Sequence, residues 1–222
     1  MNLDFSPVSD GLPYLVKGVG VTIAVTACAL ILGCAVGLLI GIARLNPKQR
    51  VVYGLSSAYV NFFRGTPLLV QLFLLFYGLP QFNIYLPAFL CGVLGLGLYS
   101  GAYVSEIVRG SIMSIDKGQV EAARSIGMSS SQAMRKIVLP QAALRMIPPL
   151  GNEFIALIKN SALVSLLTIS DLMHEAQIII STSYRSLEVY LAVALVYLIL
   201  TNIMSIALKN VETRMRAGGL VQ

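Results

Sequence analysis

The chain has 222 residues, of which 56% are hydrophobic and 12% charged, with a mean hydropathy of +0.79. Soluble domains average about 25% charged residues, so the composition excludes an ordinary soluble domain and indicates a membrane protein. The net charge of +6 is therefore interpreted as a mark of one side of a bilayer. We expect membrane lipid, and no nucleic acid, as a contact of these basic residues.

Long apolar segments define the predicted elements, because a membrane crossing needs about 20 such residues. Five spans are expected in a single transmembrane domain over residues 1–222, at 18–43, 55–79, 87–108, 137–167 and 187–208. The second span is interrupted near its start by the sequence RGTP at 64, and the fourth is expected to break at Pro148, Pro149 and Gly151. The sequence therefore predicts an all-α integral membrane protein with a polar insert at 109–136.

Basic residues are distributed unevenly between the two predicted sides of the membrane. Lys17 and Arg185 fall on the side of the N-terminus. The other side carries Arg44, Lys48, Arg50, Arg64, Arg109, Lys117, Arg124, Arg135, Lys136, Lys209, Arg214 and Arg216. By the positive-inside rule, the N-terminus is predicted outside the cell, and the polar insert and C-terminus in the cytoplasm.

Small residues recur every fourth position in two spans. Gly33, Gly37 and Gly41 form one row, and Gly97 and Gly101 form another. Such rows let helix backbones approach closely in lipid, so we expect a close helix pair, with a bending hinge as the alternative.

Metal binding is not expected. The three cysteines lie in apolar runs and are interpreted as small buried residues. His174 has only Asp171 and Glu175 nearby in the sequence, and a metal site would need more ligands.

The polar insert is predicted to form two short helices. The first contains Glu121, Ala122 and Ala123 and ends at Gly127, which suits a C-cap. Ser129 followed by Gln132 three residues later predicts a capping box for the second. A short exposed helix with an alanine face can dock into a groove of another protein; a plain solvated loop is the alternative.

The insert also resembles a family motif. EAA at 121, Gly127, Ile137 and LP at 139 match the pattern EAA-x3-G-x9-I-x-LP without departure, which is similar to the cytoplasmic E-A-A loop of type I ABC importer permeases. Further stretches resemble the polar amino acid branch, the histidine, glutamine and arginine permeases: RGTPLLVQLFLLFYGLPQF at 64, SGAYVSEIVRG at 100 and LPQAALRMIPPLGNEFIALIKNSALVSLL at 139. The resemblance covers nearly the whole chain.

The resemblance implies a five-helix permease subunit of the bacterial cytoplasmic (inner) membrane. Two such subunits, identical or homologous, would form the pathway, with a cytoplasmic ATPase inside and a solute-binding protein outside. Glu121, Ala122, Ala123 and Gly127 would couple this chain to the ATPase. The sequence has no GxxxxGK[ST] phosphate loop, so we expect no catalytic residues here, and ATP and Mg²⁺ bound by the partner.

A substrate site is predicted around the fourth span, because charges inside a bilayer are costly and mark function. Glu153 would bind the ammonium or guanidinium group of an amino acid, which favours cationic amino acids among the polar ones. Backbone N–H groups freed by the expected helix break, with Asn152 and Lys159, would hold the carboxylate. Ser100 and Tyr103 would line the cavity. The alternative is that Glu153 and Lys159 pair with each other or with neighbouring spans and only stabilise the fold.

Charged residues also lie near the start of the predicted second span and at the end of the third. Glu106 and Arg109, three residues apart on one helical face, are interpreted as a structural salt bridge. Arg64 is expected either to reach the lipid phosphates or to cap the inner mouth of the pathway. The rival function is an ion-gradient-driven secondary amino acid transporter or channel that uses Glu106 and Glu153. A membrane enzyme is disfavoured, because the sequence offers no Ser/His/Asp set, His-rich metal cluster or catalytic dyad.

Overall fold

The computed structural model describes residues 3–217, and all regular structure within them is helical. Ten α-helices follow in chain order: α1 Ser6–Asp10, α2 Leu12–Ala43, α3 Arg50–Gly65, α4 Leu68–Phe73, α5 Ala88–Met113, α6 Lys117–Ser125, α7 Ser130–Ala133, α8 Leu139–Asn160, α9 Leu172–Ser183 and α10 Ser186–Ala217. Single helical turns of other types extend α4 through Leu74–Gly78 and Leu79–Phe82, join α7 to α8 through Met134–Val138, and follow α8 at Ser161–Leu167.

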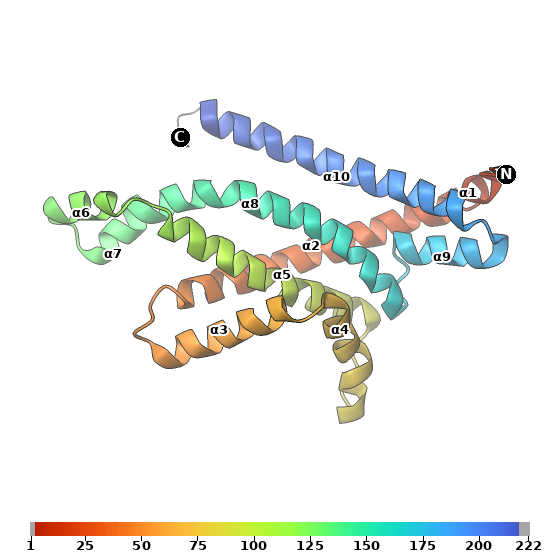
Figure 1. The fold of residues 1–222 in the computed structure, drawn as a ribbon, viewed down its shortest axis with the longest axis horizontal. Helices are drawn as coiled ribbons and strands as arrows, with labels where there is room; N and C mark the ends of the chain where they lie inside the picture. Colours follow the sequence, from red (N-terminus) through yellow and green to blue (C-terminus); the bar gives the residue numbers. More distant parts are fainter. Residues whose placement is uncertain (1–2, 218–222) are drawn as a thin grey trace.

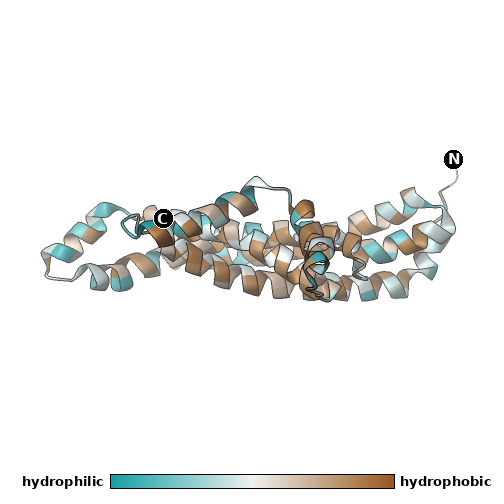
Figure 2. Cartoon of the chain, turned by 90° about the horizontal axis from the view of Figure 1, so that it is seen from below, coloured by the Kyte–Doolittle hydropathy of each residue, from teal (hydrophilic) through white to brown (hydrophobic). Residues whose placement is uncertain are grey.

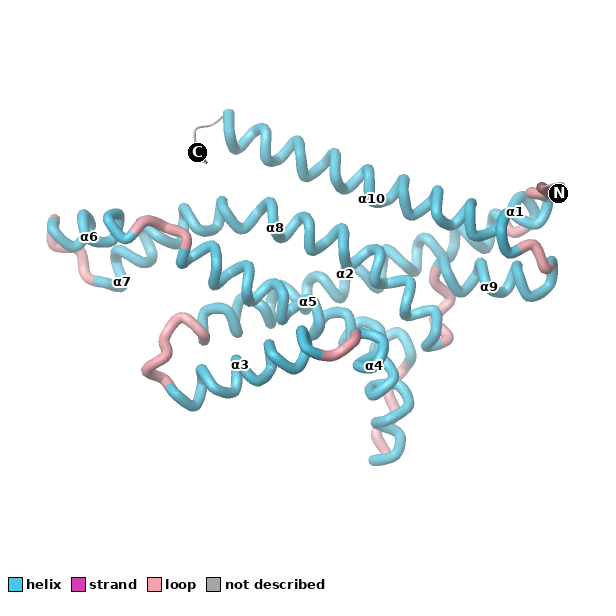
Figure 3. Tube along the Cα trace, viewed as in Figure 1, coloured by secondary structure: helices cyan, strands magenta, loops and turns pink. Residues whose placement is uncertain are grey.

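The long helices α2, α5, α8 and α10 run roughly side by side along the long axis (Figure 1). Helices α1 and α9 lie at one end with the N-terminus, whereas α6, α7 and the C-terminal end of α10 lie at the other. The tube view shows that short loops connect these elements (Figure 3). The polar insert and the N-terminal helix are therefore separated by the full length of the bundle.

Four helical segments are long and apolar enough to cross a membrane: Ser6–Ala43, Ala88–Met113, Ser130–Leu167 and Ser186–Met215. The helix pair Arg50–Gly65 and Leu68–Phe82 gives a fifth crossing if it is counted as one span. Apolar residues dominate the middle of the bundle, and polar ones are more frequent toward its two ends (Figure 2). The chain is thus a multi-pass membrane protein.

The glycine rows bring α2 and α5 into close contact, as the sequence predicts. A Cβ atom added at Gly37 would lie 2.5 Å from Cβ of Val104, and one added at Gly41 would lie 2.8 Å from Cβ of Val108. On α5, a Cβ at Gly97 would lie 2.7 Å from a methyl group of Leu32. Each notch receives a side chain of the facing helix, so the small residues serve packing.

The predicted interruption of the second span at RGTP is confirmed. The chain forms two helices there, α3 and α4, which meet at an angle of 107°. Thr66 between them is extended, with φ −120° and ψ 149°, because a residue that precedes proline is disfavoured in the helical region. Pro67 also lacks the N–H group that would continue the helix. The RGTP sequence therefore interrupts the span with a sharp corner.

The predicted break in the fourth span is wrong. Helix α8 runs unbroken through Pro148 and Pro149 to Asn160. The two prolines remove hydrogen-bond donors, but α8 is held by packing between α5 and α10. Gly151 serves that packing, since a Cβ there would lie 2.3 Å from a methyl group of Leu208 on α10. The backbone irregularity lies further on instead, in the 3₁₀ turn at Ser161–Leu167.

The buried core lies along α2, α5 and the region around the end of α8. Its largest fully buried side chains include Val25, Leu72, Leu96, Leu157 and Leu167. A second apolar cluster, with Leu172 and Val189, holds α9 and α10 together at the N-terminal end. Most of α10 is exposed on the isolated chain, as expected for a helix that faces lipid or another subunit.

Candidate functional site

The polar insert forms the two capped helices that its sequence predicts. Gly127 follows α6 with φ +87°, a conformation that favours glycine. The Gly127 and Met128 N–H groups donate to the Arg124 and Ala123 carbonyl oxygens, at 3.1 Å each, which is the Schellman C-cap. Ser129 and Gln132 form a reciprocal capping box before α7. The plain-loop alternative does not fit this ordered hairpin.

The three residues of the E-A-A motif do not share one environment. Glu121 and Ala122 are exposed, whereas Ala123 is only 4% exposed within this chain. The base of the hairpin is tied to α8, because Arg145 Nη1 donates to the Ser114 carbonyl oxygen at 2.7 Å. One face of α6 is thus used internally, and the other is free to contact a partner.

Glu153 lies at the meeting point of α2, α5 and α8. Ser100 is beside its carboxylate, and the buried Ser100 hydroxyl makes no hydrogen bond of good geometry with a described residue. Cys34 and Tyr99 lie within electrostatic range of the same carboxylate. No lysine, arginine or histidine in the described chain forms an ion pair with Glu153. The carboxylate is therefore held in the bundle without a counter-charge.

Two other predicted substrate residues lie elsewhere on α8. Asn152 is exposed and lines a groove between α8 and α10, together with Ser205, Lys209 and Glu212. Lys159 is also exposed and makes no ion pair with the described residues. The alternative of a Glu153–Lys159 pair therefore does not occur. The structure brings Glu153 and Ser100 together, but it does not bring Asn152 into their group.

Tyr103 belongs to a polar chain that leads away from Glu153. The Tyr99 and Tyr103 hydroxyl groups are 3.1 Å apart, and the Arg64 guanidinium lies 5.3 Å from the centre of the Tyr103 ring. Tyr99 is also within electrostatic range of Glu153, so polar side chains occur between Glu153 and the corner between α3 and α4.

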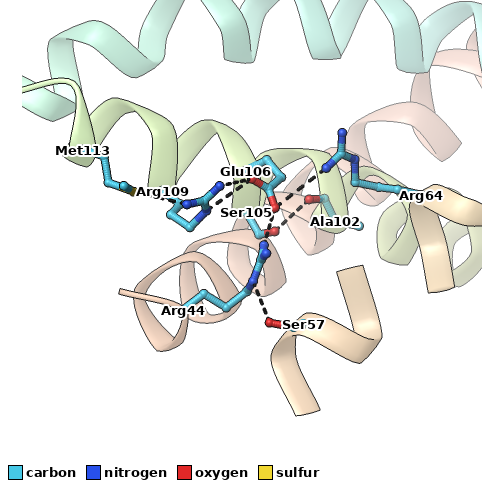
Figure 4. A network of polar contacts seen from close by, with 8 residues as sticks. All are labelled: Arg44, Ser57, Arg64, Ala102, Ser105, Glu106, Arg109 and Met113. Carbon is cyan, nitrogen blue, oxygen red and sulfur yellow. Dashed lines mark hydrogen bonds and ion pairs between the residues drawn. The ribbon is translucent and has the colours of Figure 1, made fainter. Parts of the chain in front are cut away.

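Glu106 is the centre of an arginine cluster (Figure 4). It accepts hydrogen bonds from Arg44 Nη1 and, at 2.9 Å, from Arg109 Nη2. Arg64 Nη1 lies 3.8 Å from the same carboxylate, and Arg44 Nε donates to Ser57 Oγ at 3.3 Å. The predicted Glu106–Arg109 bridge is confirmed. Arg64 turns inward to Tyr103 and Glu106, rather than outward to lipid phosphates alone.

Sequence reasoning missed Cys34, Tyr99 and Arg44 as members of these groups. Arg44 and Glu106 are 62 residues apart, and no periodicity connects positions on different helices. The glycine rows were an available signal for Cys34, because Cys34 follows Gly33, whose notch receives Ser100. Tyr99 could have been found one turn from Tyr103 on the same helix.

A half-buried carboxylate without a counter-charge among membrane-spanning helices indicates a functional site, as expected for a membrane transport protein. The chain matches the model of one family, described as the binding-protein-dependent transport system inner membrane component, over residues 17–217. It belongs to that family. This places it among the permease subunits of ABC importers and not among their ATPases.

Named relatives lie in the amino acid branch. The chain is 42% identical over 200 residues to PatM of Vibrio harveyi, a probable amino-acid ABC transporter permease, with 89% of each chain covered. It is 35% identical over 218 residues to the glutamine permease GlnP of Escherichia coli K12, covering 97% of this chain and 99% of GlnP. It is 34% identical to the arginine permease ArtQ of Bacillus subtilis, covering 98% and 99%.

Solved structures support the same fold. A crystal structure described as an amino acid ABC transporter with histidines superposes with a TM-score of 0.92 and 41% identity, covering 96% of this chain and 100% of that one. The inward-facing MetNI methionine transporter superposes with a TM-score of 0.75 at 23% identity, covering 91% and 96%, which shows the fold alone. The chain therefore has the permease fold of type I ABC importers.

Proposed function

We propose that this chain imports polar amino acids, with cationic ones preferred, as one of two permease subunits of an ATP-driven transporter. The names of its relatives support the substrate class. The observation that carries the cationic preference is Glu153, an intramembrane carboxylate without a counter-charge in the described chain. ATP and Mg²⁺ bind to the cytoplasmic ATPase, and a solute-binding protein delivers the amino acid from outside.

In this proposal, Glu153 binds the cationic side chain or the α-ammonium group of the substrate, and the Ser100 hydroxyl binds beside it. Tyr103 supports the site through Tyr99. Asn152 and Lys159 are exposed on this chain, and we place them toward the second permease. In that position, Lys159 would meet the substrate carboxylate across the subunit interface.

Coupling is proposed to run through the exposed face of α6. Glu121 and Ala122 enter a cleft of the ATPase, while Ala123 and Gly127 keep the shape of the hairpin. Movement of α6 passes to α5 and α8, because Arg145 joins the hairpin base to both helices. The predicted orientation, with the N-terminus outside, places this hairpin in the cytoplasm with the ATPase.

The direct test is the complete transporter in proteoliposomes. ATPase activity and uptake are measured with arginine, lysine, histidine, ornithine, glutamine and glutamate, each with its binding protein. Stimulation by a cationic amino acid and uptake that requires ATP support the proposal. Uptake driven by a proton or Na⁺ gradient in vesicles without ATP would establish the ion-driven rival instead.

A matched pair of variants tests coupling. Ala122→Trp changes an exposed site, so we expect transport to fall by roughly tenfold or more with an unchanged melting temperature, because the ATPase cleft is filled. Ala123→Trp changes a buried site and should lower the melting temperature as well. Equal transport by Ala122→Trp and the wild type would rule out this docking face.

A further inference from the structure

A cavity of about 610 Å³ lies between α1 and α9, at the end of the bundle opposite the coupling hairpin (Figure 1). Asp10, Gly11, Tyr14, Glu175, Ile178 and Thr182 line it. Its shape depends on a close contact, since a Cβ atom added at Gly11 would lie 2.4 Å from a methyl group of Ile179. The cavity is distinct from the Glu153 site, which lies where α2, α5 and α8 meet.

Most carboxylates at this end of the bundle already have partners. Asp4 Oδ1 accepts from the Ser6 N–H group, Glu188 accepts from the Asp4 N–H group and pairs with Arg185, and Asp171 caps α9. Asp10 and Glu175 differ, because neither side chain forms a hydrogen bond or ion pair with a described residue. These two unpartnered carboxylates are the two that line the cavity.

Glu175 carries the argument most strongly. The residue as a whole is only 8% exposed, and the part of it that stays accessible is the carboxylate in the cavity. A cation that enters the cavity would therefore meet both carboxylates with no competing partner among the described residues. Glu175 lies in the first turn of α9, where the helix dipole favours a negative charge. The dipole does not supply a counter-ion.

We propose that this cavity receives a lysine or arginine side chain of the solute-binding protein when that protein docks. The hydrocarbon stem would lie against Tyr14 and Ile178, and the charged group would reach Glu175 and Asp10. A free amino acid fits less well, because its carboxylate would face these two acids and no lysine or arginine lines the cavity. This inference rests on the proposed function, which places this end of the bundle outside the cell.

The test uses the complete transporter in lipid nanodiscs and its fluorescently labelled solute-binding protein. For Glu175→Gln we expect the dissociation constant of docking to rise roughly tenfold at low salt, with a smaller rise for Asp10→Asn, because an ion pair at an interface is lost. Thr182→Lys, which supplies an internal cation at an exposed position, should weaken docking similarly. Asp4→Asn is the matched control, since Asp4 is already bonded, and should leave affinity within twofold.

Carbodiimide crosslinking then identifies the partner side chain. The reagent joins a carboxylate to a lysine in direct contact, so mass spectrometry should detect Glu175 linked to a lysine of the binding protein. Charge exchange between those two residues should restore affinity. Basal ATPase activity of each variant reports correct assembly.

Two outcomes would overturn the inference. Normal docking by an assembled Glu175→Gln transporter excludes the ion pair, and Glu175-dependent binding of millimolar free arginine, with protein docking unchanged, makes the cavity a small-molecule site. Neither outcome affects the proposed function if import continues. A wild-type transporter that neither docks the binding protein nor imports amino acids would instead contradict the proposed function itself.

Discussion

Two carboxylates in the membrane-spanning helices have opposite surroundings. Glu106 contacts Arg44 and Arg109 directly and has Arg64 at 3.8 Å. Glu153 has a serine, a cysteine and a tyrosine near it, and no cation of the described chain pairs with it. Charges at the centre of a span cost about 3 kcal/mol each on insertion scales. The comparison separates a carboxylate satisfied within the fold from one left available to an external cation.

The Glu106 region also explains how α3 is attached. Arg44 on α2 contacts both Glu106 on α5 and Ser57 on α3, and the Tyr59 hydroxyl of α3 donates to the Leu98 carbonyl oxygen at 2.6 Å. Three helices therefore converge on one carboxylate. Its role in assembly does not require a substrate.

The largest effect is expected for Glu106→Gln. Removal of the carboxylate leaves Arg44 and its neighbours without their counter-charge. Because Glu106 is partly exposed, we expect a cost of about 2 kcal/mol, between that of an exposed and that of a buried pair. We expect a clear loss of melting temperature and of folded yield in detergent. Glu212→Gln on α10, which removes a carboxylate outside any ion pair among residues 3–217, is the control.

A double variant sharpens this prediction. Arg44→Gln combined with Glu106→Gln should be less destabilised than the sum of the single variants, because the two charges compensate one another. Additive losses would mean that Glu106 and Arg44 are not energetically coupled.

Asp171 provides a third carboxylate, outside the spans, for comparison. It is fully buried at the start of α9, and burial raises its pKa from 3.8 to about 6, although the His174 N–H group stabilises the charge. The folded state therefore holds the proton more tightly than the unfolded state. Its contribution to stability is complete below about pH 4 and falls by about 3 kcal/mol as the pH rises through 6.

Asp171→Asn tests that assignment, because asparagine keeps the N-cap but cannot ionise. Melting temperatures of both proteins are measured from pH 4 to pH 7. The wild type should lose stability relative to the variant as the pH rises. Parallel curves would mean that Asp171 titrates in its ordinary range.

Glu153→Gln should lower transport and leave stability nearly unchanged, whereas Glu106→Gln should lower stability. Uptake of a cationic amino acid is expected to fall roughly tenfold, since the charge attraction at the site is lost, while the melting temperature stays within a few degrees of the wild type. Uptake is measured in proteoliposomes at matched protein density. Unchanged uptake would remove Glu153 from the substrate site, and a large loss of stability would make it structural like Glu106.

Arg64→Gln should have the smallest effect. The Arg64 side chain is 46% exposed and 3.8 Å from Glu106, so solvent screens the pair and we expect a loss of less than about 1 kcal/mol. The melting temperatures of Arg64→Gln and Arg44→Gln are compared, and Arg44→Gln should show the larger loss. A larger loss for Arg64 than for Arg44 would reverse our ranking of the cluster.

Much of the fold is predictable from this sequence, because its signals are local. The apolar runs predict helices, the glycine rows predict the α2–α5 contact, and Gly127, Ser129 and Gln132 predict both caps of the hairpin. The failed prediction, the break in the fourth span, has a physical cause. The effect of proline depends on its neighbours. Pro67 lies at the corner between α3 and α4, whereas Pro148 and Pro149 lie within α8, which stays helical where it packs between α5 and α10.

The candidate sites are less predictable, because they join residues that are distant along the chain. Asn152 and Glu153 were predicted to serve one substrate site, but adjacent residues on a helix point about 100° apart, and Asn152 faces the α10 groove instead. The Glu106–Arg109 pair was visible because both residues lie on one helix. The contribution of Arg44 depends on the packing of α2 against α5, which no spacing rule provides.

The interlocked α2–α5 pair has a mechanical consequence. Because Val104 and Val108 seat in the notches at Gly37 and Gly41, sliding either helix by a fraction of a turn would drive backbone into side chain. The two helices must consequently move together as one rigid unit in any conformational change. Any rearrangement that exposes Glu153 first to one side and then to the other has to be accommodated where α8 packs against this pair and where α10 packs against α8.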